Sequence, residues 1–317
     1  MSSTERVNVK ALLDPELRQA LDAFELPTID AEGVAAMRGA SFASTDLSDA
    51  VARTDHEVPG DPPVPVRVHR PKDAAGLLPA IITIHGGGYV MGSYDMDSPL
   101  LDRWCQSLEV VGVSVEYRLA PETSYPGPLE DCYAALRWAY DNAGSLGIDR
   151  DRIGLYGLSA GGGLAAALAL LARDRGEVPL AFVLLDCPML DDRQRTPSIN
   201  AEGLYVWGSG SNEFGWRSYL GALYGSDDVP SYAAAAREAD LSGLPPTCVV
   251  VGAIDGFRDE DIAYAQRLNQ AGVPCELHVI AGLPHAYLLV PGAAAVQLAG
   301  HCKDDWLTRQ LAGRLSD

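Results

Sequence analysis

The chain is poor in basic residues and has no run of lysine and arginine. Of its 317 residues, 24 are Lys or Arg and 43 are Asp or Glu, so its formal net charge at pH 7 is −19. A field of this sign repels the phosphates of nucleic acids and the headgroups of anionic membranes. No nucleic-acid partner is therefore expected, because binding one would require a local basic patch.

Long apolar runs are also missing. No window of the sequence reaches 18 consecutive apolar residues, so no membrane span is expected. Residues 1–10 are polar and lack the apolar stretch of a signal peptide, so no such peptide is expected either. These two absences favour a cytoplasmic protein.

Cysteine is scarce and dispersed. The chain has six cysteines and none of them form a Cys-x-x-Cys pair, which argues against a disulfide framework and against a zinc site. Reduced thiols in a core are the simpler interpretation. We expect no metal and no other cofactor.

What the chain does have is material for a large core, since 47% of its residues are hydrophobic and 21% are charged. Runs such as Ile81–Ile84 are apolar without alternation, as in strands that are covered on both faces. Eight strands are predicted, over 51–58, 64–70, 80–84, 110–115, 153–156, 181–185, 247–251 and 275–280. Helices are predicted over 99–108, 128–142, 160–174, 259–270 and 293–311. This alternation indicates an α/β fold with a mostly parallel sheet flanked by helices, after an antiparallel hairpin of the first two strands.

Two segments stand outside this alternation. Residues 1–45 are predicted to be largely helical, with Asp14-Pro15-Glu16 as one helix start and a second helix over 30–38. Residues 191–240 are too long for an ordinary loop and rich in Trp and Tyr. They are predicted to form an insertion that packs over another part of the molecule.

The sequence Gly157-Leu158-Ser159-Ala160-Gly161 lies between a predicted strand and a predicted helix. This is the Gly-x-Ser-x-Gly arrangement in which a sharp turn holds a nucleophilic serine in a strained conformation. Small residues are needed two positions before and after the serine, because larger side chains would clash. The string alone is weak evidence, and its position between strand and helix is what makes Ser159 a candidate nucleophile.

A second glycine-rich sequence, His85-Gly86-Gly87-Gly88, directly follows the predicted strand 80–84. Three glycines let the backbone approach a ligand and turn its N–H groups toward it. Such a loop supplies oxyanion-hole donors in lipase-type hydrolases. A plain glycine turn would be the alternative, and the serine motif further along the chain makes it the weaker one.

A serine nucleophile needs a histidine and an acid, in the chain order Ser, Asp or Glu, His. His278 and His301 lie inside a predicted strand and a predicted helix, whereas His285 lies in a loop after a strand. Asp255 follows the strand 247–251, and functional groups of parallel sheets gather at the carboxyl ends of strands. His285 is therefore the candidate base and Asp255 the candidate acid.

Three further acids follow Asp255 within six residues. Asp259 is predicted to be the N-cap of the helix 259–270, with Glu260 and Asp261 in its first turn. Acids in that position are favoured by the helix dipole and by unpaired N–H groups without any catalytic role.

Taken together, these motifs resemble the bacterial hormone-sensitive-lipase family of carboxylesterases. The resemblance covers residues 50 to 290 and rests on His85–Gly88, Tyr117–Glu122, Gly157–Gly162, Asp255–Glu260 and Pro284-His285. It implies the α/β-hydrolase fold, with an eight-stranded mostly parallel sheet and a helical cap. It also implies Ser159 as nucleophile, His285 as base and Asp255 as its partner, with the backbone amides of Gly87, Gly88 and Ala160 as the oxyanion hole. His85 would be structural.

The resemblance also implies a division of the chain. Residues 1–45 and 190–225 would form the two parts of the cap, and residues 46–189 and 226–317 the catalytic domain. Tyr205 and Trp207 would then face the substrate, or would only bury the cap on the sheet. The chain departs from the family pattern at Leu158, where many members have Asp, at Gly256, where Pro is usual, and at Ala286, where Gly is common.

The leading functional hypothesis is a serine carboxylesterase that hydrolyses short-chain carboxylic esters through an acyl-enzyme intermediate. A non-catalytic receptor on the same fold is disfavoured because His285 is retained, and an amidase or another acyl hydrolase on the same machinery stays open. The expected partner is a small-molecule ester. A homodimer is possible through the strand 275–280 and the helix 293–311.

Overall fold

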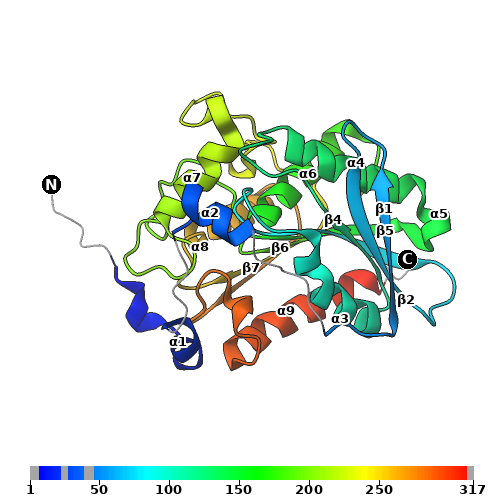
Figure 1. Cartoon of the computed structure of the whole chain (residues 1–317), viewed down its shortest axis with the longest axis horizontal. Coiled ribbons are helices and arrows are strands. Elements are labelled where there is room, and N and C mark those ends of the chain that lie inside the picture. Colours follow the sequence, from blue (N-terminus) through cyan, green and yellow to red (C-terminus); the bar gives the residue numbers. More distant parts are fainter. Residues whose placement is uncertain (1–6, 23–27, 39–45, 313–317) are drawn as a thin grey trace.

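The computed structural model describes residues 7–22, 28–38 and 46–312, and its centre is a single twisted sheet (Figure 1). The strands are β1 (Val51–Val58), β2 (Val64–Pro71), β3 (Leu78–Ile84), β4 (Val111–Val115), β5 (Ile148–Leu158), β6 (Phe182–Asp186), β7 (Thr247–Gly252) and β8 (Cys275–Ile280). Their order across the sheet is β1-β2-β4-β3-β5-β6-β7-β8. β2 pairs antiparallel with both β1 and β4, and all other pairs are parallel. The predicted α/β-hydrolase architecture is confirmed.

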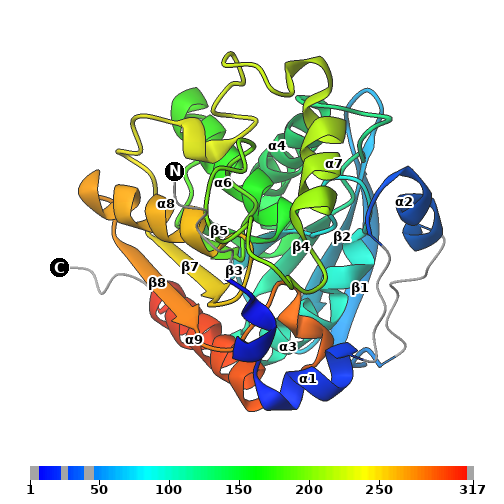
Figure 2. The ribbon, with the colours of Figure 1, turned by 90° about the vertical axis from the view of Figure 1, so that its left-hand side faces the viewer.

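Helices cover both faces of the sheet (Figures 1 and 2). They are α1 (Pro15–Asp22), α2 (Ala31–Arg38), α3 (Ser98–Leu108), α4 (Gly127–Asp141), α5 (Ala143–Leu146), α6 (Ala160–Arg175), α7 (Ser209–Leu220), α8 (Arg258–Gln270) and α9 (Ala294–Leu311). Buried side chains of α4, α6 and α8 share one hydrophobic core, and those of α1, α3 and α9 share the other. Among the described residues, no helix is long and apolar enough to cross a membrane.

Alternating side chains of the central strands supply the two cores. Ile82 of β3 belongs to the core with α4 and α6, whereas its neighbour Ile81 belongs to the core with α3 and α9. Val249 and Val250 of β7 divide in the same way. Because side chains point to opposite faces every second residue, a strand with a core on each side must be apolar throughout. This explains the unbroken apolar runs of the sequence.

The structure differs from the sequence-based prediction most at β5 and α7, and it also has the short unpredicted helix α5. β5 begins at Ile148, five residues before the predicted start, because the polar residues 149–152 extend the strand without an apolar pattern that would reveal it. α7 lies in the insertion and was not predicted; it contains two glycines beyond its first residue, and its buried Trp216 and Tyr219 tie it to the core. Of the predicted N-terminal helical region, residues 1–6, 23–27 and 39–45 lie outside the described residues.

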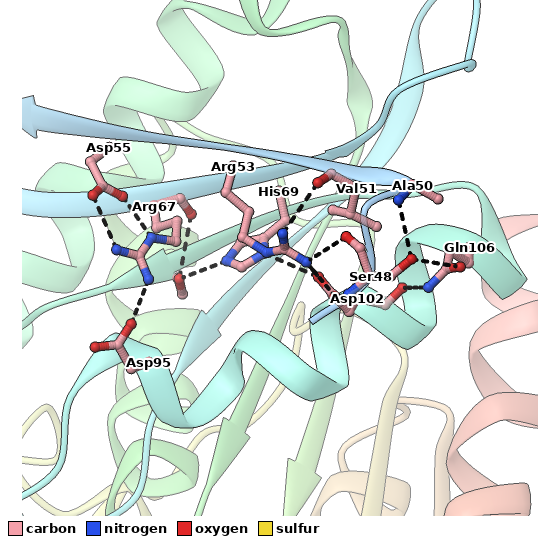
Figure 3. A network of polar contacts seen from close by, with 11 residues as sticks. Ser48, Ala50, Val51, Arg53, Asp55, Arg67, His69, Asp95, Asp102 and Gln106 are labelled. Atoms are coloured by element: carbon pink, nitrogen blue, oxygen red, sulfur yellow. Dashed lines mark hydrogen bonds and ion pairs between the residues drawn. The ribbon is translucent and has the colours of Figure 1, made fainter. Parts of the chain in front are cut away.

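A polar network attaches the β1–β2 hairpin to α3 (Figure 3). The carboxylate of Asp102, on α3, contacts the Arg53 guanidinium of β1 and accepts the backbone N–H of Ser48 at 2.6 Å. His69 of β2 lies completely buried beside this pair, with its Nδ1 atom 4.0 Å from Asp102. Burial lowers the pKa of His69 to about 4, and the nearby charge of Arg53 acts in the same direction.

This neutral, buried histidine makes the free energy of unfolding depend on pH. Its native pKa of about 4 lies below the unfolded value of about 6.5, so between these values the unfolded chain binds a proton that the native state excludes. The contribution of His69 is therefore full above pH 6.5 and declines as pH falls toward 4, by about 3 kcal/mol in total. We expect His69→Gln to flatten the profile over this range in urea titrations, relative to its own baseline at pH 7.5. Parallel profiles for the two proteins would contradict this.

Candidate active site

The turn between β5 and α6 holds Ser159 in an unusual backbone conformation. Ser159 has φ +56° and ψ −118°, and the strand ends and the helix begins at its two neighbours. A Cβ atom on Gly157 would lie 2.2 Å from the backbone oxygen of Gly161, and one on Gly161 would lie 2.0 Å from that of Ile84. No side chain fits at either glycine, which is the physical reason for the motif.

Ser159, His285 and Asp255 form a continuous hydrogen-bonded chain. The Oγ atom of Ser159 lies 2.9 Å from Nε2 of His285, and Nδ1 of His285 lies 2.8 Å from Oδ2 of Asp255. A carboxylate only accepts, so Nδ1 carries the proton and Nε2 is free to accept from the serine. All three side chains are at most 6% exposed. The structure thus brings together three residues that the sequence separates by up to 126 positions.

The remaining contacts of the pair fix its orientation. The second carboxylate oxygen of Asp255 accepts the backbone N–H of Phe257 at 2.8 Å. The Phe257 ring stands edge-on to the imidazole of His285, with centroids 5.0 Å apart and an interplanar angle of 89°. The acid and the base are therefore each held by a contact outside the chain of three.

The glycine loop after β3 lies beside Ser159. Gly87 and Gly88 have φ of +117° and +60°, and a Cβ atom on Gly88 would lie 2.0 Å from the indole of Trp207. The backbone N–H of Ala160, the first residue of α6, has no acceptor within its own helix. Gly87 and Gly88 line the same cavity as Ser159, and a Cβ atom on the preceding Gly86 would lie 3.4 Å from that of Ser159.

His85 anchors this loop from below. It is fully buried, its Nδ1–H donates to the carbonyl of Gly86 at 2.8 Å, and its ring stacks on Tyr117 with centroids 4.2 Å apart. The Tyr117 hydroxyl donates in turn to the carbonyl of His85. Burial lowers the pKa of His85 to about 4, so the ring is neutral at pH 7. These contacts suit the structural role that we expected for His85.

A cavity of about 280 Å³ opens onto Ser159 and His285. No charged side chain is among the residues that line it, which are Ile29, Met37, Gly86, Gly87, Gly88, Met91, Gly92, Met96, Leu158, Ser159, Val206, Trp207, His285, Ala286 and Leu289. The chain has five methionines, and three of them lie here. The cavity is therefore suited to a small, uncharged, apolar group.

The two aromatic residues that were proposed for the pocket separate in the structure. Trp207 lines the cavity, and its indole N–H donates to Asn212 at 3.2 Å. Tyr205 instead donates its hydroxyl to Asp22 on α1, at 3.4 Å, and lines a different cavity between α1 and the insertion. Of the two residues, only Trp207 therefore lines the cavity at Ser159. In a β-strand, residues two positions apart point to the same face. Tyr205 and Trp207 lie in an irregular loop, where the sequence offers no such rule.

Glu260 and Asp261 lie in the first turn of α8, as we predicted, but Asp259 lies there too and is not the N-cap. Phe257 occupies the N-cap of α8, and Asp259 lies within the helix, where it accepts the backbone N–H of Ser198 at 2.8 Å. Glu260 is buried and accepts the backbone N–H groups of Leu190 and Asp191 at 2.8 and 3.1 Å.

Asp261 is fully buried, and neither of its carboxylate oxygens has a hydrogen-bond partner among the described residues. Burial holds the pKa values of Glu260 and Asp261 well above those of ordinary carboxylic acids. Asp259 and Glu260 thus anchor the start of the insertion through its backbone N–H groups, and no local sequence pattern distinguishes that role from a helix-dipole interaction.

One group of side chains has ligand atoms close enough for a metal ion, within the part of the chain that the structure describes. Cys187, Asp255 and His285 offer one atom each, all within 4.8 Å of one another, although their sequence spacing matches no metal motif. Burial raises the pKa of the Cys187 thiol well above its usual value, so the thiolate that a metal needs is disfavoured. Asp255 and His285 are already bonded to each other. This group is a poor fit for a metal ion.

The chain is similar in sequence to known hydrolases and esterases. Residues 81–289 match a family model described as alpha/beta hydrolase fold. Carboxylesterase NlhH of Mycobacterium tuberculosis is 36% identical over 305 residues, which cover 92% of this chain and 95% of that protein. Ethyl acetate hydrolase of Pseudomonas putida is 33% identical over 229 residues, 71% of each chain.

Solved structures of esterases also superpose closely on this chain. A bacterial heroin esterase superposes with a TM-score of 0.90 at 42% identity, covering 95% of this chain and 98% of its own. Esterase LipW of Mycobacterium marinum superposes with a TM-score of 0.83 at 35% identity, covering 94% and 96%.

The hydrogen bond between Ser159 and His285 predicts a serine that reacts without a metal. We expect a fluorophosphonate to label the chain at Ser159 at a rate that EDTA leaves unchanged, because the histidine rather than a metal activates the hydroxyl. Peptide mass spectrometry identifies the labelled residue, and Ser159→Ala should remove the label. Loss of labelling in EDTA that zinc restores would show that a metal takes part.

Proposed function

The chain belongs to the alpha/beta hydrolase fold family and is a carboxylic ester hydrolase, and we propose that Ser159, His285 and Asp255 carry out its reaction. The family membership bears out the resemblance to the bacterial hormone-sensitive-lipase family. The observation that supports the three residues most directly is the pair of hydrogen bonds, 2.9 and 2.8 Å long, that joins the serine to the histidine and the histidine to the acid.

In the proposed reaction, Oγ of Ser159 attacks the ester carbonyl while Nε2 of His285 takes the serine proton. Negative charge develops on the carbonyl oxygen, where the amides of Gly87, Gly88 and Ala160 stabilise it by about 3 kcal/mol per donor. Collapse of the tetrahedral intermediate breaks the bond to the alcohol, which leaves with the proton from His285. A water molecule, deprotonated by His285, then attacks the acyl-enzyme, and the proton returns to Ser159 as the carboxylic acid is released.

Asp255 acts in this scheme by orienting the imidazole. Its hydrogen bond to Nδ1 selects the tautomer in which Nε2 is a free acceptor, and its charge stabilises the imidazolium that forms during attack. The imidazolium is nearly buried, so a fixed counter-charge within hydrogen-bond distance is worth more than it would be in water.

We propose short-chain, uncharged esters as the substrate class. At about 280 Å³ the cavity at Ser159 lies just below the usual range for ligand sites, which is about 300–1,000 Å³. Its apolar lining favours acyl or alcohol groups without charge, since a charged group there would lose its hydration without a partner. Three methionines among the lining residues can adapt their shape to small differences between substrates.

We also propose that residues 1–45 and 190–225 act as a cap over a catalytic domain of residues 46–189 and 226–317. In support, Ile29 and Met37 from the first segment line the cavity at Ser159 together with Val206 and Trp207 from the second. The two segments also contact each other, because the Ser211 hydroxyl accepts the backbone N–H of Ile29 at 3.0 Å. α2 and α7 lie near each other in Figures 1 and 2.

Two further proposals concern the setting of the protein. The six cysteines are all unpaired, which suits a reducing compartment such as the cytoplasm. β8 is an edge strand whose residues are mostly half-buried, so pairing with a second copy would cover it and give a homodimer.

The assignment of the acid predicts different results for two neighbouring aspartates. Asp255→Asn should lower kcat by about 10²–10⁴ with the fold intact, because the amide no longer selects the productive tautomer of His285. Asp259→Asn is the matched control: it keeps an acceptor for the Ser198 N–H, and its kcat should stay within a few fold. Kinetics on a chromogenic ester and melting curves for both variants, with Ser159→Ala as the inactive reference, test this. The opposite pattern would show that the acid is misassigned.

The size of the cavity predicts the dependence on chain length. Aryl esters from acetate to hexanoate should be hydrolysed with a higher kcat/KM than dodecanoate or longer esters, because the long chains cannot be accommodated. Met96→Ala removes a side chain from the cavity wall, so it should enlarge the cavity and move the optimum of kcat/KM toward longer acyl chains. Palmitate esters as the best substrates of the unmodified protein would overturn this interpretation.

A further inference from the structure

A buried ion pair lies behind the catalytic residues, at the carboxyl end of β6. Asp186, the last residue of that strand, is fully buried, and the ammonium of Lys303 from α9, which is 1% exposed, contacts its carboxylate. Removing two opposite charges from water is costly unless both are well satisfied by partners. Such a pair is therefore weak evidence for stability, and its position calls for another explanation.

Two tyrosines complete the contacts of Asp186. The hydroxyl of Tyr287 donates to Oδ1, and the hydroxyl of Tyr156 on β5 donates to Oδ2 at 3.2 Å. Lys303 also lies 3.4 Å from the Tyr287 hydroxyl. Both tyrosines are buried, and burial raises their pKa values well above the usual range, so that both remain donors at the pH of ordinary assays.

This arrangement is connected to both reacting side chains. The backbone carbonyl of Asp186 accepts the N–H of Ser159 at 2.9 Å, within the strained turn. Tyr287 is two residues beyond His285, and Ala286 between them has φ +54°, a left-handed conformation that non-glycine residues adopt only when their surroundings impose it. The hydroxyl of Tyr287 is a fixed point for the loop that carries the imidazole.

We propose that Tyr287, Asp186 and Lys303 are positioning residues that hold the His285 loop in register with the Ser159 turn, an inference that rests on the proposed function of that site. Asp186 connects the two loops, one through its backbone and one through its side chain. Lys303 supplies the charge that keeps this carboxylate in place between them. Small misplacements of a reacting group are expensive, since about 1 Å can lower a rate by a factor of about 10².

The chain contains a matched control for this proposal. Tyr156 and Tyr287 are both buried and both donate to the carboxylate of Asp186, so either Tyr→Phe substitution removes one hydroxyl and one hydrogen bond from the same acceptor. They differ in location, because Tyr156 lies inside β5 and packs edge-on against Trp104, with centroids 5.1 Å apart. If the Asp186 carboxylate only stabilises the fold, the two substitutions should change kcat equally. If it positions the His285 loop, only Tyr287→Phe should lower kcat.

The test compares Tyr287→Phe and Tyr156→Phe in the full chain. Both variants should have similarly lowered melting temperatures. Tyr287→Phe should lower kcat about tenfold with KM within twofold, because the base is displaced while Tyr287 itself does not line the cavity. Tyr156→Phe should keep kcat within twofold. Equal changes in kcat for both, or an unchanged kcat for Tyr287→Phe, would overturn the proposal.

A spectroscopic measurement separates this inference from the proposed function. The proton on Nδ1 of His285, shared with Asp255, should give a far-downfield proton resonance in the unmodified protein. We expect it to shift or broaden in Tyr287→Phe and to stay in place in Tyr156→Phe, whether or not any ester is hydrolysed. An absence of ester hydrolysis with this pattern present would refute the proposed function alone, and an identical resonance in all three proteins would refute the positioning role alone.

Discussion

The close packing of α6 against the ends of β3 and β5 is the constraint on which the site depends. At this point a Cβ atom on Gly161 would lie 2.0 Å from the Ile84 oxygen, so the helix can start there only if that position is glycine. The turn from β5 into α6 takes place at one residue, Ser159, which adopts φ +56°. Ser159 lines the cavity at this turn. The glycine loop follows β3 directly, so the same contact brings Gly87 and Gly88 to the serine.

The protein interior near the site carries less negative charge than the composition suggests. The formal charge of −19 counts every acid as ionised, yet burial raises the pKa of Asp97 to about 7 and those of Glu260 and Asp261 further above the usual range. A raised pKa makes an acid harder to ionise, so Glu260 and Asp261 compete less with Asp255 for the charge of the proposed imidazolium.

Much of this could be predicted from the sequence, because the informative patterns are local. Apolar runs without alternation predicted the central strands, and the short motifs around Ser159, His85 and His285 fall where strands end. The polar start of β5 and the glycine-containing α7 could not be found in this way, since pairing and burial from distant residues stabilise them. The same limit applies to Asp186 and Lys303, which are 117 residues apart and meet only in the folded chain.

The candidate site combines a rigid group of residues around Ser159 with flexible methionine side chains in the cavity. Ser159, His285 and the glycine loop are fixed by backbone geometry, buried hydrogen bonds and ring stacking, each of which leaves little freedom. Other parts of the cavity lining are different, since Met37 of α2, and Met91 and Met96 of the connection between β3 and α3, have unbranched, flexible side chains. A rate depends on the geometry of the reacting atoms to within a fraction of an ångström, whereas binding of an apolar group depends mainly on excluding water from its surface. A rigid backbone therefore suits the serine, and flexible methionine side chains suit a cavity that encloses an apolar group.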